Sequence, residues 1–410
     1  MLAKESGICV FIYMAAYELT LANDKWSKRI IKLIPAILII VAWRIVYNLL
    51  GYGFYGGDIY ADPIRDPLSF LHAVFEKTPI IFADLWGLLL ADIYLAFSHA
   101  IRIKIVWITT GFSIFVLIMV LPLLRKNQLA RFWFLGMTGS MMVSCAALFS
   151  RTFLFAGIGA FGLITLFMND VINKAGWLLK SKFWLIPAKT FCIFLLLAHI
   201  LLNIAARFTS PAMYGIVINS LNTAMVVDWR PEFEDKDIIL VNCPMVLAGM
   251  MSPYYGSYHK QPFPRSMHML SIGIEGAEVI RVDEKRLLLK APSGNLIRFE
   301  REDDLHLAHI LNVVNSMVRG KQFPMQPGQL VTTGKFTSEV VAVDDSKMPK
   351  EVLFTFNEVL EESELYFLWF NWHDGQYHKF QIPQIGQSAP IPAIPQVSLA
   401  DALRFIMKSF

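Results

Sequence analysis

Charged residues are scarce in this sequence. Asp, Glu, Lys and Arg together account for 17% of its 410 residues, whereas soluble domains carry about 25%. This composition argues against an ordinary cytosolic enzyme. The basic residues lie between apolar stretches and form no extended patch, so the sequence also predicts no nucleic-acid partner.

Cysteine is rare as well, with four residues in the chain. Only Cys243 falls in the second half, so that half can form no internal disulfide. The sequence contains no Cys-x-x-Cys pair and no Gly-x-Ser-x-Gly elbow, and no Gly-rich phosphate loop stands out. It therefore gives no support to a redox dithiol, a nucleotide site of that kind or a serine hydrolase.

The sequence does contain two halves of opposite net charge. Residues 1–205 are mostly apolar, with 18 basic and 10 acidic side chains, whereas residues 206–410 have 19 basic and 23 acidic side chains. This division predicts a polytopic transmembrane helical domain over residues 1–206. We expect an extracytoplasmic α+β domain, mainly antiparallel β, over residues 207–395, and a short terminal helix over residues 396–410.

Six stretches of the first half are predicted to cross the membrane as helices, because a bilayer span needs about 20 mostly apolar residues. The six predicted spans are residues 6–21, 33–50, 105–124, 132–149, 152–168 and 190–206. A lipid bilayer is therefore the first expected partner, and the oligomeric state stays open.

The orientation of these spans follows from their basic loops, because short loops rich in Lys and Arg stay in the cytoplasm. If the six spans alternate, three basic clusters fall on one side. They are Lys25, Lys28, Arg29 and Lys32; Arg125, Lys126 and Arg131; and Lys174, Lys180 and Lys182. The amino terminus and residues 207–410 then lie outside the cytoplasm. Since an exported domain without disulfides is typical of bacteria, we expect a bacterial inner membrane.

The acidic segment 51–103 is expected on the outer side. Its apolar stretches are interrupted by charges such as Glu76, Lys77 and Asp84, a pattern that favours helices lying in the membrane interface over a seventh span. We interpret the segment as interfacial helices that cover the bundle. A cover over an active site is the alternative.

The second half is predicted to form strands and one or two helices. Strands are expected at 277–282 and 286–290, joined by a turn at 283–285. The strongest hairpin signal joins residues 364–372 to 377–382 through His373-Asp374-Gly375, since Asp-Gly is a preferred turn pair. A short apolar run at 237–242 is followed by a predicted helix that extends to about Tyr255.

Two short motifs resemble those of the GT-C superfamily of membrane glycosyltransferases, the superfamily of protein O-mannosyltransferase-like enzymes. Lys4-Glu5 stands between small residues and leads directly into an apolar helix, as in the segment that opens a middle helix of that family. Arg151 precedes a helix that begins with aromatic residues and Leu before a Gly, which resembles a second family motif. The order of the two motifs also agrees with the family.

This resemblance implies a reaction that moves a sugar from a polyisoprenyl-phosphate donor to an acceptor at the outer membrane face. Lys4 and Arg151 are then candidates for binding the donor phosphate, and Glu5 belongs to the same candidate site or pairs with Lys4. The alternative is that both cations only extend to the interface. The family's catalytic acidic residue would precede Lys4, so the resemblance implies an amino-terminally shortened member. The catalytic residues, and whether the chain is active alone, stay open.

Three acidic residues, Asp58, Asp62 and Asp66, recur at intervals of four. Their carboxylates are a weak candidate site for Mg²⁺ or Mn²⁺, and a solvated acidic loop is the simpler interpretation. Arg44, inside the second predicted span, needs a partner, and Glu18 of the first span is the expected one.

The sequence thus supports two main hypotheses. The first is a membrane glycosyltransferase of the GT-C type, of which this chain resembles the carboxy-terminal part. The second is a non-catalytic membrane anchor that presents a β domain to polysaccharide or to an envelope partner. A transporter is less favoured, because few ionisable residues lie inside the spans.

Overall fold

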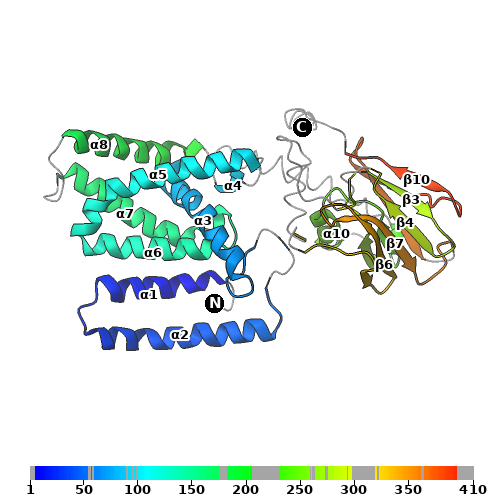
Figure 1. The fold of residues 1–410 in the computed structure, drawn as a ribbon, viewed down its shortest axis with the longest axis horizontal. Coiled ribbons are helices and arrows are strands. Elements are labelled where there is room, and N and C mark those ends of the chain that lie inside the picture. The colour runs from blue at the N-terminus through cyan, green and yellow to red at the C-terminus, as the bar shows by residue number, and fades with distance from the viewer. Residues whose placement is uncertain are drawn as a thin grey trace. The chain divides into compact units, whose positions relative to one another are not determined.

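The computed structural model describes most of the chain. The described residues are 5–53, 57, 60–88, 91–94, 97, 99–174, 182–202, 204–205, 231–258, 260, 264–272, 276–292, 294–297, 319–320, 323–361 and 364–394. The chain divides into two compact units (Figure 1). The helical unit comprises Met1–Tyr55 and Ile59–Thr209, and the β unit comprises Gly56–Asp58 and Ser210–Phe410.

The helical unit contains α-helices together with short 3₁₀ and π segments. Its α-helices are α1 (Ile8–Thr20), α2 (Trp26–Leu49), α3 (Pro67–Ala83), α4 (Ala91–Tyr94), α5 (His99–Lys126), α6 (Gln128–Ser144), α7 (Leu154–Ile172) and α8 (Lys182–Leu196). Its short 3₁₀ and π segments are η1 (Glu5–Gly7), η2 (Asp84–Leu88), η3 (Ser150–Thr152) and η4 (Leu197–Leu202).

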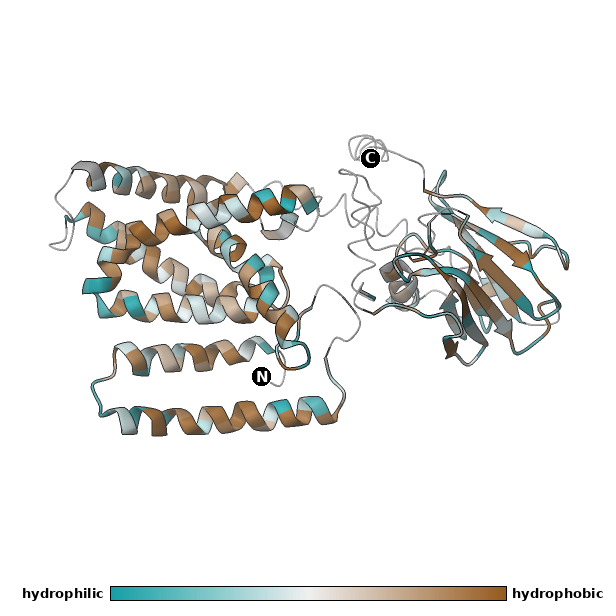
Figure 2. Ribbon diagram, in the orientation of Figure 1, coloured by the Kyte–Doolittle hydropathy of each residue, from teal (hydrophilic) through white to brown (hydrophobic). Residues whose placement is uncertain are grey.

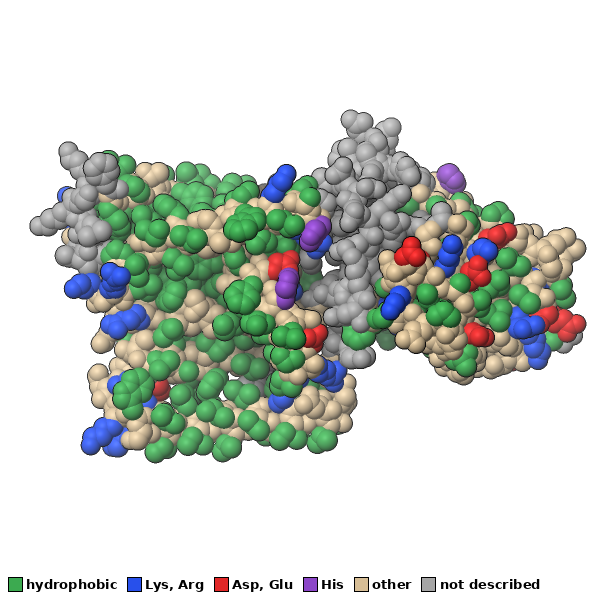
Figure 3. All heavy atoms as spheres, in the orientation of Figure 1, with side chains coloured by type: hydrophobic (Ala, Val, Ile, Leu, Met, Phe, Trp, Pro, Cys, Tyr) green, Lys and Arg blue, Asp and Glu red, His purple; other side chains and the backbone are tan. Residues whose placement is uncertain are grey.

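Six of these helices, α1, α2, α5, α6, α7 and α8, run alongside one another in an alternating up-and-down order (Figure 1). The turns between α1 and α2 and between α5 and α6, the end of α7 and the start of α8 all lie at one end of the bundle, where Figure 3 shows many Lys and Arg side chains. We call this the basic end. The start of α1, the end of α2 and the connection from α6 to α7 lie at the other end, which we call the polar end.

Four helices in the described part of the chain are long and apolar enough to cross a membrane. They are α2, α5, α7 and the continuous helix from Trp184 to Leu202 formed by α8 and η4. Helix α1 has 13 residues and α6 has 17, which at 1.5 Å per residue is less than a full span. The structure thus supports a helical membrane part with four candidate spans, and the six predicted spans stay a prediction.

Helix α3 enters the bundle. Asp66 caps its first turn, where the side chain accepts a hydrogen bond from the Ser69 backbone N–H (3.0 Å). The last turn, from Ile80 to Ala83, is buried among the other helices. We predicted interfacial helices that only cover the bundle. The end of α3 instead lies inside it, because its continuous apolar run packs against other helices on all sides.

The chain then turns back toward the polar end. Gly87 has a φ of 106° at the turn, a conformation that glycine adopts without a Cβ clash. The Asp84 side chain accepts a hydrogen bond from the Ala91 backbone N–H (3.0 Å). Tyr94 of α4 donates to Glu76 of α3 (2.5 Å between Oη and Oε1). Segment α3–η2–α4 is therefore a helical hairpin inserted into the bundle.

The β unit contains two sheets. Its strands are β1 (Asp237–Leu240), β2 (Ser266–Met269), β3 (Ala277–Arg281), β4 (Arg286–Lys290), β5 (Leu330–Thr332), β6 (Phe336–Val343), β7 (Pro349–Phe356), β8 (Leu365–Asn371), β9 (Gln376–Lys379) and β10 (Ser388–Ile391). The first sheet has the order β2-β1-β8-β9 and the second has the order β10-β3-β4-β7-β6-β5. Helix α10 (Val246–Tyr258) and the 3₁₀ segment η5 (Pro231–Phe233) complete the described elements.

Both predicted hairpins are confirmed. Strands β3 and β4 pair antiparallel across Asp283, and β8 and β9 pair antiparallel across Asp374-Gly375. Gly375 has a φ of 71° there. A largely apolar layer between the two sheets forms the core, with Val279, Phe356 and Phe367 among its buried members.

One sheet departs from the predicted antiparallel pattern, because β1 pairs parallel with both β2 and β8. Helix α10 connects β1 to β2, and a connection of this length is what parallel neighbours require. The sequence predicted both the strand and the helix, but a local pattern does not specify on which side the next strand returns. The predicted terminal helix at 396–410 lies outside the described residues.

Candidate functional site

The polar end of the bundle brings together the segments on which the resemblance rests. Glu5 begins η1, directly before α1, and its Oε1 accepts a hydrogen bond from the Tyr47 hydroxyl of α2 (3.0 Å). Arg151 lies on η3, directly before α7. Lys4 lies outside the described residues. The Tyr13 hydroxyl of α1 donates to the Phe155 carbonyl of α7 (2.6 Å) and so ties the first turns of these two helices together.

The Arg151 side chain is exposed. Its guanidinium carbon lies 5.0 Å from the centroid of the Phe149 ring, a distance typical of a cation–π contact. It forms no ion pair with any described residue. Because the side chain is exposed, its guanidinium is accessible to an anion, to which an arginine can donate a bidentate pair of hydrogen bonds.

A second charged group at this end was expected to have a different partner. Arg44 of α2 donates through Nη2 to both carboxylate oxygens of Asp62 (3.0 and 2.9 Å). The predicted pair with Glu18 is wrong, because Glu18 interacts with Lys32 (3.8 Å) at the basic end. The two helices are antiparallel, so Arg44, near the end of α2, lies level with the start of α1 and far from Glu18. The antiparallel alignment of α1 and α2 is enough to show that Glu18 and Arg44 lie at opposite ends of the two helices.

The Asp62 carboxylate is fully engaged. Besides Arg44, its Oδ1 accepts hydrogen bonds from the backbone N–H groups of Ile64 (2.8 Å) and Arg65 (3.2 Å). Burial by itself would raise the pKa of Asp62, but these hydrogen bonds and the Arg44 charge outweigh it and leave the pKa below its ordinary value. Nearby, burial raises the pKa of Tyr60 to about 12. Asp62 is therefore ionised and serves to hold Arg44.

The two described members of the acidic triplet both have structural partners. Asp62 is committed to Arg44, Asp66 caps α3, and Asp58 lies outside the described residues. Within the described part of the chain, no group of three His, Cys, Asp or Glu side chains is arranged to hold a metal ion. Asp62 and Asp66, the described members of the weak candidate site for Mg²⁺ or Mn²⁺, therefore both serve the structure of the turn.

Sequence reasoning did not single out Lys77 as part of this end. Its Nζ donates a hydrogen bond to the carbonyl of Cys145 at the end of α6 (3.2 Å). The Ala61 backbone N–H bonds to the carbonyl of Ala146 (2.9 Å), so the loop before α3 and the connection from α6 to α7 are joined. Only the insertion of α3 brings Lys77 here, and no local pattern in the sequence indicates that insertion.

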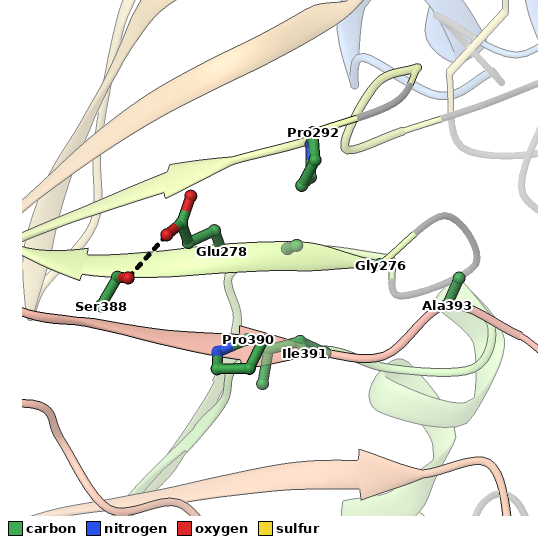
Figure 4. A pocket seen from close by; sticks show the side chains of 8 residues that line it. Gly276, Glu278, Pro292, Ser388, Pro390, Ile391 and Ala393 are labelled. Carbon is green, nitrogen blue, oxygen red and sulfur yellow. Dashed lines mark hydrogen bonds between the residues drawn. The ribbon is translucent and has the colours of Figure 1, made fainter.

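The β unit has a groove lined by residues of the paired strands β3 and β10 and by Pro292, which follows β4 (Figure 4). Its volume is about 470 Å³. Pro292, Pro390 and Ile391 make most of its lining apolar, and the carboxylate of Glu278 accepts a hydrogen bond from the Ser388 hydroxyl (2.6 Å). The groove is shallow and is lined by one carboxylate, that of Glu278. Such a lining is more typical of a binding surface than of a catalytic centre.

An ion-pair network around a buried carboxylate lies at the start of β1. The Asp237 carboxylate accepts from Arg265 (2.5 Å), Lys335 (2.6 Å) and Ser266 (2.6 Å). Burial would raise the pKa of Asp237, but these three partners hold it well below its usual range. Lys335 precedes β6 of the second sheet, so the network fastens one sheet to the other. With its oxygens occupied, Asp237 has a structural role.

Comparisons with protein-family models, with curated proteins and with solved structures find no match. The function is therefore argued from the arrangement of the polar end and of the β unit.

Proposed function

We propose that this chain is an integral membrane protein that binds a polyisoprenyl-phosphate sugar at the polar end of its helical bundle. It would serve sugar transfer to an acceptor at the outer membrane face. The observation that carries the proposal is the placement of the Glu5 and Arg151 segments at one end of the bundle, opposite the basic end. The resemblance requires this placement of two motifs that lie 146 positions apart in the sequence.

The chemistry of the donor fits the exposed cation at this end. A sugar leaves its polyisoprenyl carrier with the phosphate as the leaving group, so negative charge develops on the phosphate oxygens. Arg151 would stabilise that charge by donating two N–H hydrogen bonds to the phosphate oxygens, and Lys4 is proposed to add a second positive charge. Glu5 is hydrogen-bonded to Tyr47 and is proposed to position the start of α1. The base that would activate the acceptor hydroxyl is not assigned.

The proposal includes an orientation. Because basic loops stay in the cytoplasm, the basic end would face the cytoplasm and the polar end the outside of a bacterial inner membrane. The continuous helix α8–η4 ends at Leu202, at the polar end, so the chain that follows it would emerge on the outer side together with the β unit. A reporter enzyme fused after Phe410 tests this orientation. Activity confined to the cytosol would overturn it.

The residue assignment is tested by lipid binding. We expect the chain in detergent to be cross-linked by a photoreactive polyisoprenyl phosphate, and Arg151→Ala to weaken this binding about tenfold, the loss of one charge-assisted bidentate contact. Arg151→Lys should keep part of it. The matched control is Arg131→Ala, which removes a cation at the start of α6, at the basic end. Equal binding by the Arg151→Ala and Arg131→Ala proteins would remove Arg151 from the site.

A second function is favoured by a different observation. The described carboxylates Glu5 and Asp62 at the polar end both have partners, whereas the β unit presents the groove beside Glu278. The chain would then be a non-catalytic anchor whose β unit binds polysaccharide in that groove. Co-sedimentation of the detergent-solubilised chain with cell-wall polysaccharide tests this function. We expect it to decrease in the Glu278→Ala protein and to be unaffected by Arg151→Ala, and the opposite result would favour sugar transfer.

A further inference from the structure

Helix α2 makes few contacts with the rest of the bundle. None of its 24 residues is buried. The less exposed residues recur every three or four positions and face α1; they are Arg29, Leu33, Ala36, Ile40, Trp43, Arg44 and Tyr47. The rest of the surface of α2 is almost entirely apolar and open (Figure 2). Helix α2 is therefore loosely packed against α1, whereas α1 itself packs closely on α6.

A groove of about 360 Å³ lies where α1, α2 and α6 meet. Most of the side chains that line it are apolar or aromatic: Val10, Tyr13, Met14, Tyr17, Leu33 and Phe132. Tyr13 is held in place by its hydrogen bond to the Phe155 carbonyl and by edge contact with the Phe132 ring (5.8 Å between centroids). The wall of the groove is thus built from ordered rings, and its shape and polarity suit a hydrocarbon chain.

The groove ends among charged side chains at the basic end. Glu18 and Lys32 line this part of it and lie 3.8 Å apart. Lys25, Lys28 and Lys32 share one face of the chain entering α2, because they are three and four residues apart. Lys25 and Lys28 are exposed and form no ion pair with any described residue.

The local charge balance identifies the kind of ligand. The turn carries four cations, Lys25, Lys28, Arg29 and Lys32, against the two carboxylates of Glu18 and Asp24, which leaves a net charge of +2. Glu18 also has one oxygen, Oε2, that is buried and has no hydrogen-bond partner. A ligand that complements this end has an anionic group for the lysines and a hydroxyl for the carboxylate, joined to an apolar chain.

We propose that the groove binds one anionic phospholipid with a hydroxyl-bearing headgroup, phosphatidylglycerol, from the surrounding bilayer. Its phosphate would lie against Lys28 and Lys32, a headgroup hydroxyl would donate to Glu18 Oε2, and one acyl chain would follow α1 along Val10 and Met14. Basic pockets between membrane helices are known to hold anionic headgroups in this way. The site lies at the opposite end of the bundle from the proposed donor site and does not depend on sugar transfer.

The test compares lipid binding by the full chain and its variants. The chain is reconstituted in phosphatidylcholine bilayers with spin-labelled phosphatidylglycerol or spin-labelled phosphatidylcholine of the same acyl chains. The ratio of the two association constants is then measured by electron paramagnetic resonance. The test variant, Lys25→Ala/Lys28→Ala, removes two exposed cations without breaking an ion pair. Arg125→Ala/Lys126→Ala, at the end of α5, is the matched control, because it removes two cations of the same end that do not belong to the turn beside the groove.

We expect the wild type to prefer phosphatidylglycerol about fivefold. The preference should fall to about 1 in the Lys25→Ala/Lys28→Ala protein and persist in the control. A groove-filling variant, Met14→Trp, keeps all charges and should also lower the association of phosphatidylglycerol. An equal loss in both double variants would mean that only the overall charge of the basic end matters, and this result would overturn the proposal. No preference in the wild type would overturn it as well.

Discussion

The helical unit and the β unit place their apolar side chains in opposite ways. Leu38 and Ile39, at the middle of α2, are each 62% exposed, and Figure 3 shows hydrophobic side chains covering the visible face of the bundle between its two ends. In the β unit the large rings, such as Phe354 and Phe356, are buried between the sheets. The helical unit thus carries these residue types on its outer surface as well as in its core, whereas the β unit buries most of its large rings between the sheets. This is the difference expected between a hydrocarbon and an aqueous solvent.

The charged residues show the same contrast. In the helical unit they gather at the two ends, and the Arg44–Asp62 pair is almost fully covered, with 17% and 7% of the side chains exposed. In the β unit exposed pairs such as Arg286–Asp283 (2.6 Å) lie at the surface. Exposed pairs contribute little to stability, whereas a covered pair needs both of its members. The Arg44–Asp62 pair and the exposed pairs of the β unit should therefore respond differently to the same kind of substitution.

The largest expected difference comes from placing a carboxylate on each surface. Leu38→Asp should reduce membrane insertion of α2 by about 3 to 4 kcal/mol, because an ionised side chain at the centre of a span is costly. Val331→Asp, on the exposed edge strand β5, should change the stability of the β unit by less than about 0.5 kcal/mol. A glycosylation-mapping assay measures the first and thermal unfolding measures the second. Normal insertion of the Leu38→Asp protein would contradict the membrane assignment of α2.

The second test concerns the covered pair. Asp62→Ala should destabilise the helical unit by about 3 kcal/mol, because it leaves Arg44 without its counter-ion. The double variant Arg44→Leu/Asp62→Leu should recover most of that loss, since apolar side chains replace both charges. Unfolding of the purified chain in mixed micelles measures both. If Asp62→Ala alone were harmless, the pair would behave like the exposed pairs of the β unit.

Glycine packing provides a third and smaller effect. A Cβ added at Gly159 of α7 would lie 2.6 Å from the Trp133 carbonyl oxygen and 2.8 Å from the Met137 nitrogen of α6, so Gly159→Ala should cost about 1 to 3 kcal/mol. Gly111 of α5 has no atom within 4 Å of such a Cβ, and Gly111→Ala should be neutral or stabilise the helix by up to about 1 kcal/mol. Thermal unfolding of the two single variants decides whether α6 and α7 need this close approach.

The smallest effect is a pH dependence in the β unit. The pKa of Asp237 is depressed in the folded state. The ionised side chain therefore stabilises the fold above its unfolded pKa of about 4, and this contribution is lost as the pH falls toward the folded pKa. Asp237 should account for about 1 kcal/mol of the stability lost between pH 7 and pH 3. The Asp237→Asn protein should lack this part, as measured by thermal unfolding of the β unit at both pH values.

Much of the architecture could be predicted from local patterns. The division into an apolar helical part and a β part follows from hydropathy and charge, and the hairpin at Asp374-Gly375 follows from its turn residues. The prediction that the basic clusters share one side agrees with the ends at which α1, α5 and α7 finish. These features depend on neighbours in the sequence or on the simple alternation of spans, so no tertiary information is needed.

The candidate site was predicted less completely. Glu5 and Arg151 do reach the same end of the bundle, but the sequence assigned Arg44 to Glu18 and left Asp62 as a metal candidate. Lys77 was not included in the site. Each of these errors concerns a contact whose partner lies in another element, and the choice among several possible partners depends on helix register and packing.

The sequence by itself determined which segments are apolar, where cations collect and where the strands turn, because hydropathy, charge and turn propensity act over a few residues. Only the tertiary structure decided that α3 enters the bundle, that Asp62 pairs with Arg44 and that β1 lies parallel between β2 and β8. These outcomes depend on the free energy of packing distant surfaces against one another, to which many residues contribute and which no single local pattern records.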